Sequence, residues 1–124
     1  MTEKRTTLTL TQDDQDVIIT VVRTSAVMES KRMRLITEAM DAEAANKKAG
    51  IETDPDVHNL QLVQYPNCMC CTTSVEGLPW PLPFDRFKDL DGALVSKWHS
   101  AAVKLNAHWY ETEAGEQAEA KKAP

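Results

Sequence analysis

Three prolines stand at alternate positions in the segment Leu78-Pro79-Trp80-Pro81-Leu82-Pro83. Each proline ring fixes φ at about −65° and removes a backbone N–H, so the segment cannot continue a helix or join the middle of a sheet. We therefore predict a stiff, extended connector that carries Trp80 and Leu82. The connector divides the chain into an earlier part and a shorter C-terminal part.

The size and charge of the chain limit what it can do. Its 124 residues correspond to one domain, and we expect residues 1–110 to form a single compact domain. Residues 111–124 are rich in Ala, Glu and Lys without an apolar face, so we expect a disordered or frayed tail. The net charge of −5 argues against nucleic-acid binding, which depends on neutralising phosphates, and against an anionic membrane surface.

The region before the connector begins with strands and continues with helices. Thr7–Thr11 alternates apolar and polar residues, Val17–Val22 is β-branched, and a polar acidic turn lies between them. This arrangement predicts a β-hairpin, or alternatively one strand preceded by a frayed start. A long helix over Ala26–Lys48 follows, with Ser25 as its N-cap and Gly50 as its stop.

Further short elements are predicted around Pro55 and Pro66. Asp54 is placed to cap a helix whose first residue is Pro55, where the missing N–H has no cost. Pro66 either interrupts this helix or opens another through residues 67–72. Residues 73–75 then look extended, and Gly77 turns the chain. The predicted fold class is α+β, an N-terminal β-hairpin followed by a mainly helical domain of three to five helices.

The strongest helical pattern lies after the connector. A short helix is predicted for Phe84–Leu90, and Asp91 caps a final helix from Gly92 to about Tyr110. Within it Leu94, Trp98, Ala101, Leu105 and His108 or Trp109 form one apolar stripe. This stripe is either core or, in part, a surface for a partner helix. Trp98 lies mid-helix and is expected to be chiefly core, whereas Trp80 and Trp109 are expected to face a partner. The expected partner-binding residues are Trp80, Leu82, Phe84, Phe87, Leu94, Trp98, Leu105 and Trp109.

Polar residues do not form a familiar catalytic or metal-binding motif. Cys68, Cys70 and Cys71 lack the second ligand pair typical of structural zinc, so we expect buried thiols and no bound metal or cofactor. No nucleophile lies in a Gly-x-Ser-x-Gly turn and no glycine-rich phosphate loop occurs, which indicates a protein that is not an enzyme. The first residues lack the apolar core of a secretory signal, so we expect a cytoplasmic protein with reduced thiols.

The stretch from Leu60 to Tyr110 resembles small tail assembly chaperones of tailed bacteriophages. The matching residues are Tyr65-Pro66, Val75-Glu76-Gly77, Trp80-Pro81 followed by Phe84 and Phe87, and Leu105-Asn106-Ala107-His108-Trp109. This sequence departs from the family pattern at Ala107, where a proline would be expected. The resemblance implies a chaperone that coats the hydrophobic tape measure protein in the host cytoplasm and helps recruit tail tube subunits. It also implies a longer frameshifted form, for which codons of Ala120-Lys121-Lys122 offer a slip site.

These considerations leave three functional hypotheses. The first is a non-enzymatic chaperone that binds the tape measure protein, and possible self-association is part of it. The second is an acidic inhibitor, encoded by a phage or mobile element, that binds a host protein. The third is a zinc-binding module, which requires the cysteines and a histidine to converge. An exposed apolar groove would favour the first hypothesis, and a clustered acidic face the second.

Overall fold

The N-terminal hairpin is built around a two-residue turn. The computed structural model describes residues 4–110. In it β1 (Arg5–Gln12) pairs with β2 (Gln15–Val22) in antiparallel register, Leu10 opposite Val17. Between the strands Asp13 and Asp14 have φ values of 51° and 63°, the left-handed pair that a type I′ turn requires. The predicted hairpin is therefore confirmed.

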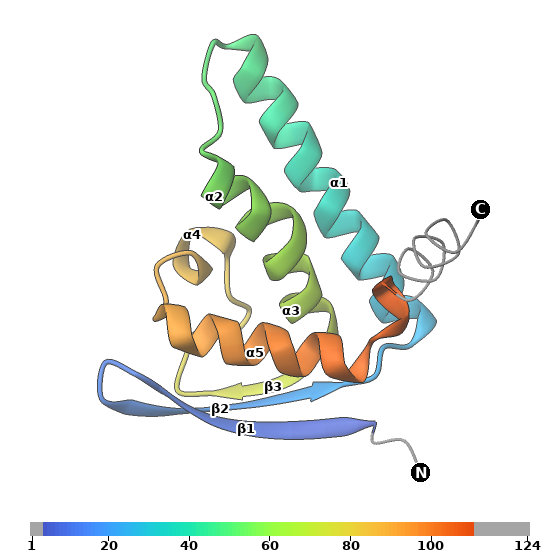
Figure 1. Ribbon diagram of the computed structural model, residues 1–124, viewed down its shortest axis with the longest axis vertical. Helices are drawn as coiled ribbons and strands as arrows, with labels where there is room; N and C mark the ends of the chain where they lie inside the picture. Colours follow the sequence, from blue (N-terminus) through green and yellow to red (C-terminus); the bar gives the residue numbers. More distant parts are fainter. Residues whose placement is uncertain (1–3, 111–124) are drawn as a thin grey trace, which may run out of the picture.

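A third strand completes the sheet, and the helices of residues 4–110 all lie on one side of it (Figure 1). The strand β3 (Thr72–Glu76) pairs antiparallel with β2, and the sheet order is β1-β2-β3. On the helix-covered face Val17, Ile19 and Val21 are fully buried. The opposite face is rich in threonine, and the hydroxyls of Thr7 and Thr20 are hydrogen-bonded across it at 3.1 Å. This alternation is typical of an antiparallel sheet packed on one side only.

The longest helix has the bounds that the sequence predicts. α1 (Ala26–Lys48) begins where the backbone N–H of Met28 donates to Ser25 Oγ at 3.3 Å. It ends before Gly50, whose φ of +79° few side chains tolerate. Leu35 and Ala39 face inward, and α1 packs along the segment that includes α3 (Tyr65–Cys71), while most of its other residues are exposed. α1 therefore stands clear of the sheet (Figure 1).

The segment from Pro55 to Cys71 is continuously helical but changes its winding. α2 (Pro55–Asn59) is capped by Asp54, whose carboxylate accepts the N–H of Asp56 at 2.8 Å. α2 continues into η1 (Leu60–Gln64), a π-helix, and then into α3. Pro66 lies in the first turn of α3, in agreement with the prediction that it opens a further helix. A π-helix was not predicted.

The last two helices are shorter than predicted. α4 (Phe84–Phe87) was expected to reach Leu90, and α5 (Gly92–Leu105) to reach about Tyr110. Asp91 caps α5 as predicted, accepting the N–H of Ala93 at 2.9 Å. α5 ends because Asn106 leaves the helical backbone conformation, with φ −123° and ψ 45°. The Asn106 side chain is hydrogen-bonded to Val22, the last residue of β2, and to Thr24, which follows that strand. The predicted stripe is therefore broken after Leu105.

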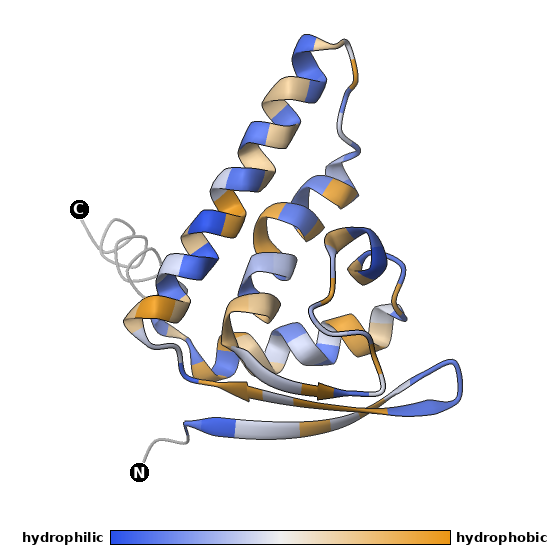
Figure 2. Ribbon diagram, turned by 180° about the vertical axis from the view of Figure 1, so that it is seen from behind, coloured by the Kyte–Doolittle hydropathy of each residue, from blue (hydrophilic) through white to orange (hydrophobic). Residues whose placement is uncertain are grey.

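Sheet and helices share one hydrophobic core. α5 lies across the sheet, and α3 lies between α5 and α1 (Figures 1 and 2). The largest fully buried side chains are Trp98 and Phe87, so the expectation that Trp98 is chiefly core is confirmed. The α+β class is confirmed as well. None of the helices within residues 4–110 has the length and apolarity that a bilayer crossing needs. The predicted tail, 111–124, lies outside the described residues.

Candidate functional site

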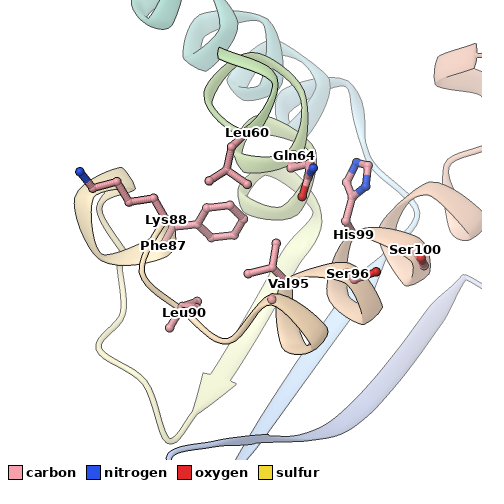
Figure 3. A pocket seen from close by; sticks show the side chains of 10 residues that line it. Leu60, Gln64, Phe87, Lys88, Leu90, Val95, Ser96, His99 and Ser100 are labelled. Atoms are coloured by element: carbon pink, nitrogen blue, oxygen red, sulfur yellow. The ribbon is translucent and has the colours of Figure 1, made fainter. Parts of the chain in front are cut away.

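A groove of about 410 Å³ opens between η1, α4 and α5 (Figure 3). One part of its lining is apolar and comes from Leu60, Phe87, Leu90 and Val95. The other part is polar, and Gln64 and His99 lie side by side there with Ser96 and Ser100 nearby on α5 (Figure 3). Lys88 extends at the rim (Figure 3). The groove thus combines an apolar floor with hydrogen-bonding groups at one end, the usual make-up of a binding site.

The π-helix shapes one wall of the groove. Pro66 has no N–H to give to the carbonyl of Leu62, and its ring crowds that carbonyl, so regular α-helical bonding fails just before it. The N–H of Tyr65 instead donates to the carbonyl of Leu60, five residues back. Leu60 and Gln64, the first and last residues of η1, both line the groove. Single π-turns are rare and occur often at functional sites. This wall is therefore a candidate for part of a binding site.

An aromatic chain fixes the wall formed by α4. Phe87 is fully buried and contacts the ring of Tyr65 edge-on, with centroids 5.2 Å apart, and the ring of Trp98, with centroids 5.8 Å apart. Tyr65 also donates its hydroxyl to the Leu82 carbonyl at 2.6 Å, which attaches the proline-rich connector to α3. The groove therefore has a rigid floor, because Phe87 cannot move without disturbing the core.

His99 is the titratable ring of the groove. The Asn67 side-chain amide donates to His99 Nε2, with the two nitrogens 3.0 Å apart, so the ring proton belongs on Nδ1. Asn67 is fully buried and is itself held by Arg32, whose Nε donates to Asn67 Oδ1 at 2.6 Å. Burial lowers the pKa of His99 below its ordinary value, so the ring is neutral near pH 7.

Five of the eight expected partner-binding residues are core residues. Leu82, Phe87, Leu94, Trp98 and Leu105 are at most 8% exposed. The sheet and α3 both pack against α5, and the indole N–H of Trp98 donates to Thr72 Oγ1 at 3.0 Å inside the core. This placement corrects the expectation that the stripe offers an open face. Of the eight, only Phe87 reaches the groove.

The other three residues lie nearer the surface. Trp80 is 37% exposed on the connector, and Phe84 is half-buried against Tyr65. Trp109 is half-buried, and its indole N–H donates to Glu29 Oε1 at 2.6 Å. The guanidinium of Arg32 also stacks over the Trp109 ring, 4.7 Å from its centroid. Trp109 is thus largely occupied by contacts to α1, whereas Trp80 keeps an open face.

A second polar cluster joins the end of α5 to the start of α1. Glu29 accepts from Trp109, is paired with His108 at 2.7 Å, and also accepts the hydroxyl of Thr24. Burial alone would raise the pKa of Glu29, but the hydrogen bonds from Thr24, His108 and Trp109 together lower it. These contacts are internal to the chain, so we interpret this cluster as structural.

The cysteines do not form a metal site within residues 4–110. Cys68, Cys70 and Cys71 are buried free thiols, as predicted. Burial raises the pKa of Cys68, and the hydrogen bond with Cys70 together with burial raises that of Cys71, which keeps both protonated. No group of three or more His, Cys, Asp or Glu in this part of the chain is placed to hold a metal ion. The zinc hypothesis therefore gains no support from the described residues.

Most groove residues were not among the expected site residues. Gln64 lies on η1, Leu90 in the turn after α4 and His99 on α5, and nothing in their spacing shows that they meet. The one available signal was Pro66 after an uninterrupted helical stretch, which predicts a local change of winding. Comparison of the chain with protein-family models, curated proteins and solved structures gave no match.

Proposed function

We propose that the protein is a non-enzymatic binding protein that receives an apolar segment of a client protein in the groove between η1, α4 and α5. The observation that carries the proposal is the make-up of this groove, which has an apolar floor, a neutral polar end and a lysine at its rim. An amphipathic helix could bury one or two large side chains against Leu60 and Leu90 while its polar flank meets Gln64 and Ser100.

The client that fits this reading is the tape measure protein of a tailed bacteriophage, with tail assembly as the process served. The resemblance of Leu60–Tyr110 to tail assembly chaperones supports this choice, and the groove lies within that stretch. A long client with repeated apolar segments would engage many copies, so weak individual contacts suffice. The acidic charge of the chain would keep such a complex soluble.

The groove can be blocked without disturbing the core. Ser96 and Ser100 are exposed on α5 and line the groove, so Ser96→Arg and Ser100→Arg should fill it with a long cationic side chain. Ser74→Arg is the matched control, because Ser74 is exposed on β3, away from the groove. Each variant is co-expressed with tape measure fragments, and the soluble fraction of client and its co-purification are measured.

We expect both groove variants to lose client retention and the control to keep it. Far-UV circular dichroism and thermal unfolding establish that all three variants are folded. Retention of the client by both folded groove variants would rule out this groove as the binding site. Failure of every tape measure fragment to be retained by the wild-type protein would reject the client.

One observation favours the acidic inhibitor as a second candidate. Asp13, Asp14 and Asp91 line a recess of about 400 Å³ beside the hairpin turn, with Lys97 the one cationic residue in its lining. Substituting all three by Asn removes the charge but keeps the left-handed turn and the helix cap, which Asn also favours. Loss of binding to basic host proteins in this variant, with client retention unchanged, would support inhibition over chaperoning.

A further inference from the structure

The outward side of α1 carries an apolar stripe that the rest of the described chain leaves uncovered. Met33 is 54% exposed and Met40 is 56% exposed. Seven residues make nearly two helical turns, so both side chains leave α1 in almost the same direction. α2 and α3 lie along the other side of the helix, where Leu35 and Ala39 pack (Figures 1 and 2).

Two charges of opposite sign lie beside Met33 and Met40. Arg34 follows Met33 and Asp41 follows Met40, so the two charged residues are also one heptad apart and share one flank of the stripe. Arg34 is exposed, and its only ion pair with a described residue is to Glu38, one turn away on the same helix. Among the described residues no ion pair engages Asp41.

This charge order fits a second copy of α1 that runs in the opposite direction. In an antiparallel pair, Met33 of one copy packs near Met40 of the other, and Arg34 faces Asp41. A two-fold axis repeats this contact, so both charge pairs form at once. In a parallel pair the two-fold axis runs along the helices, so the flank that carries Arg34 and Asp41 does not meet its own copy and neither ion pair forms. The positions of Arg34 and Asp41 therefore favour the antiparallel direction.

We propose that two copies of the protein associate antiparallel through this face of α1, with Met33 and Met40 at its centre and Arg34–Asp41 pairs at its edge. The association is weak, because a single pair of helices buries less than the ~1,200 Å² of the smallest stable interfaces. The groove between η1, α4 and α5 is lined by other elements, so this inference does not depend on the proposed function.

Sedimentation velocity over a series from micromolar to near-millimolar protein tests the proposal. The wild-type protein should shift from monomer to dimer, and Met33→Glu combined with Met40→Glu should remain monomeric. Each of the single changes Arg34→Glu and Asp41→Arg should raise the dimer dissociation constant about tenfold, since two symmetry-related pairs are lost together. A variant that combines Arg34→Glu with Asp41→Arg should associate again, because the ion pair re-forms with its two charges exchanged.

Thermal unfolding of the dilute monomers controls for damage to the fold, and exposed positions on α1 should change it little. Lys104→Glu, an exposed substitution on α5, controls for a general effect of net charge. A wild-type protein that stays monomeric throughout overturns the proposal. A dimer that survives the paired methionine change also overturns it, and so does a charge exchange that fails to restore association in folded protein.

Discussion

Asn106 joins the end of α5 to the β2–α1 junction, and its removal tests how the C-terminal part is fixed to the sheet. The side chain is fully buried. Its Oδ1 accepts the N–H of Thr24 at 2.8 Å, and its Nδ2 donates to the carbonyls of Val22 at 3.1 Å and Ala102 at 3.0 Å. Asn106→Ala removes these three bonds and the contact of the Thr24 hydroxyl with Oδ1 at 3.1 Å.

The expected cost follows from which groups lose their partner. The Ala102 carbonyl keeps the backbone N–H of Asn106 at 3.1 Å, so it stays bonded. The Thr24 N–H and the Val22 carbonyl, both partly buried, each lose a partner, at about 1–2 kcal/mol for each group, the lower part of the range for a buried group left unsatisfied. The sum, roughly 2–4 kcal/mol, is a large share of the stability of a small domain. It corresponds to a fall in melting temperature of roughly 10–25 °C.

Urea unfolding followed by tryptophan fluorescence measures this loss. Asn46→Ala is the control, since Asn46 is exposed on α1 and should change the free energy of unfolding by less than about 0.5 kcal/mol. Asn106→Asp provides a second test, because a carboxylate would face two carbonyl oxygens. That variant should regain stability as pH falls and the acid protonates. A cost for Asn106→Ala no larger than the control would refute the role given to these hydrogen bonds.

Three further predictions concern other parts of the molecule. The pKa of His99 is lowered by burial, so the unfolded chain binds the extra proton, and stability should fall as pH drops through about 6.5; in His99→Gln this part of the pH dependence should vanish in unfolding titrations. Cys68 and Cys71 should resist alkylation in the native protein and react only on unfolding, because burial keeps the thiols protonated, and rapid modification under native conditions would contradict their placement. Gly77→Ala should cost more than Gly50→Ala in thermal unfolding: both residues have positive φ, but an added Cβ at Gly77 would lie 2.5 Å from the Asp16 carbonyl oxygen, and at Gly50 nothing lies within 4 Å.

The elements closest to strong local signals were predicted well. Ser25 and Gly50 define the ends of α1, and Asp54 and Asp91 cap α2 and α5, because capping depends on groups within one turn of the helix end. The hairpin followed from two β-branched or alternating runs around a polar turn. Such features depend on a few adjacent residues, and the tertiary packing leaves them unchanged.

Features that depend on distant residues were not predicted. The stripe of α5 continues past Leu105 in the sequence, but Asn106 is 82 residues away from the Thr24 N–H that it binds, and that contact ends the helix. The pairing of β3 with β2 joins residues more than fifty positions apart in the sequence. The groove forms only where η1, α4 and α5 pack together.

The sequence by itself determined where the chain turns, where its helices begin, and that Trp98 would be buried. Only the tertiary structure decided which aromatic residues remain open. Five of the eight expected binding residues are buried in the shared core, while Trp80 on the connector remains 37% exposed. Periodicity identifies an apolar face, but whether a neighbour covers that face is decided by contacts between residues far apart in the chain.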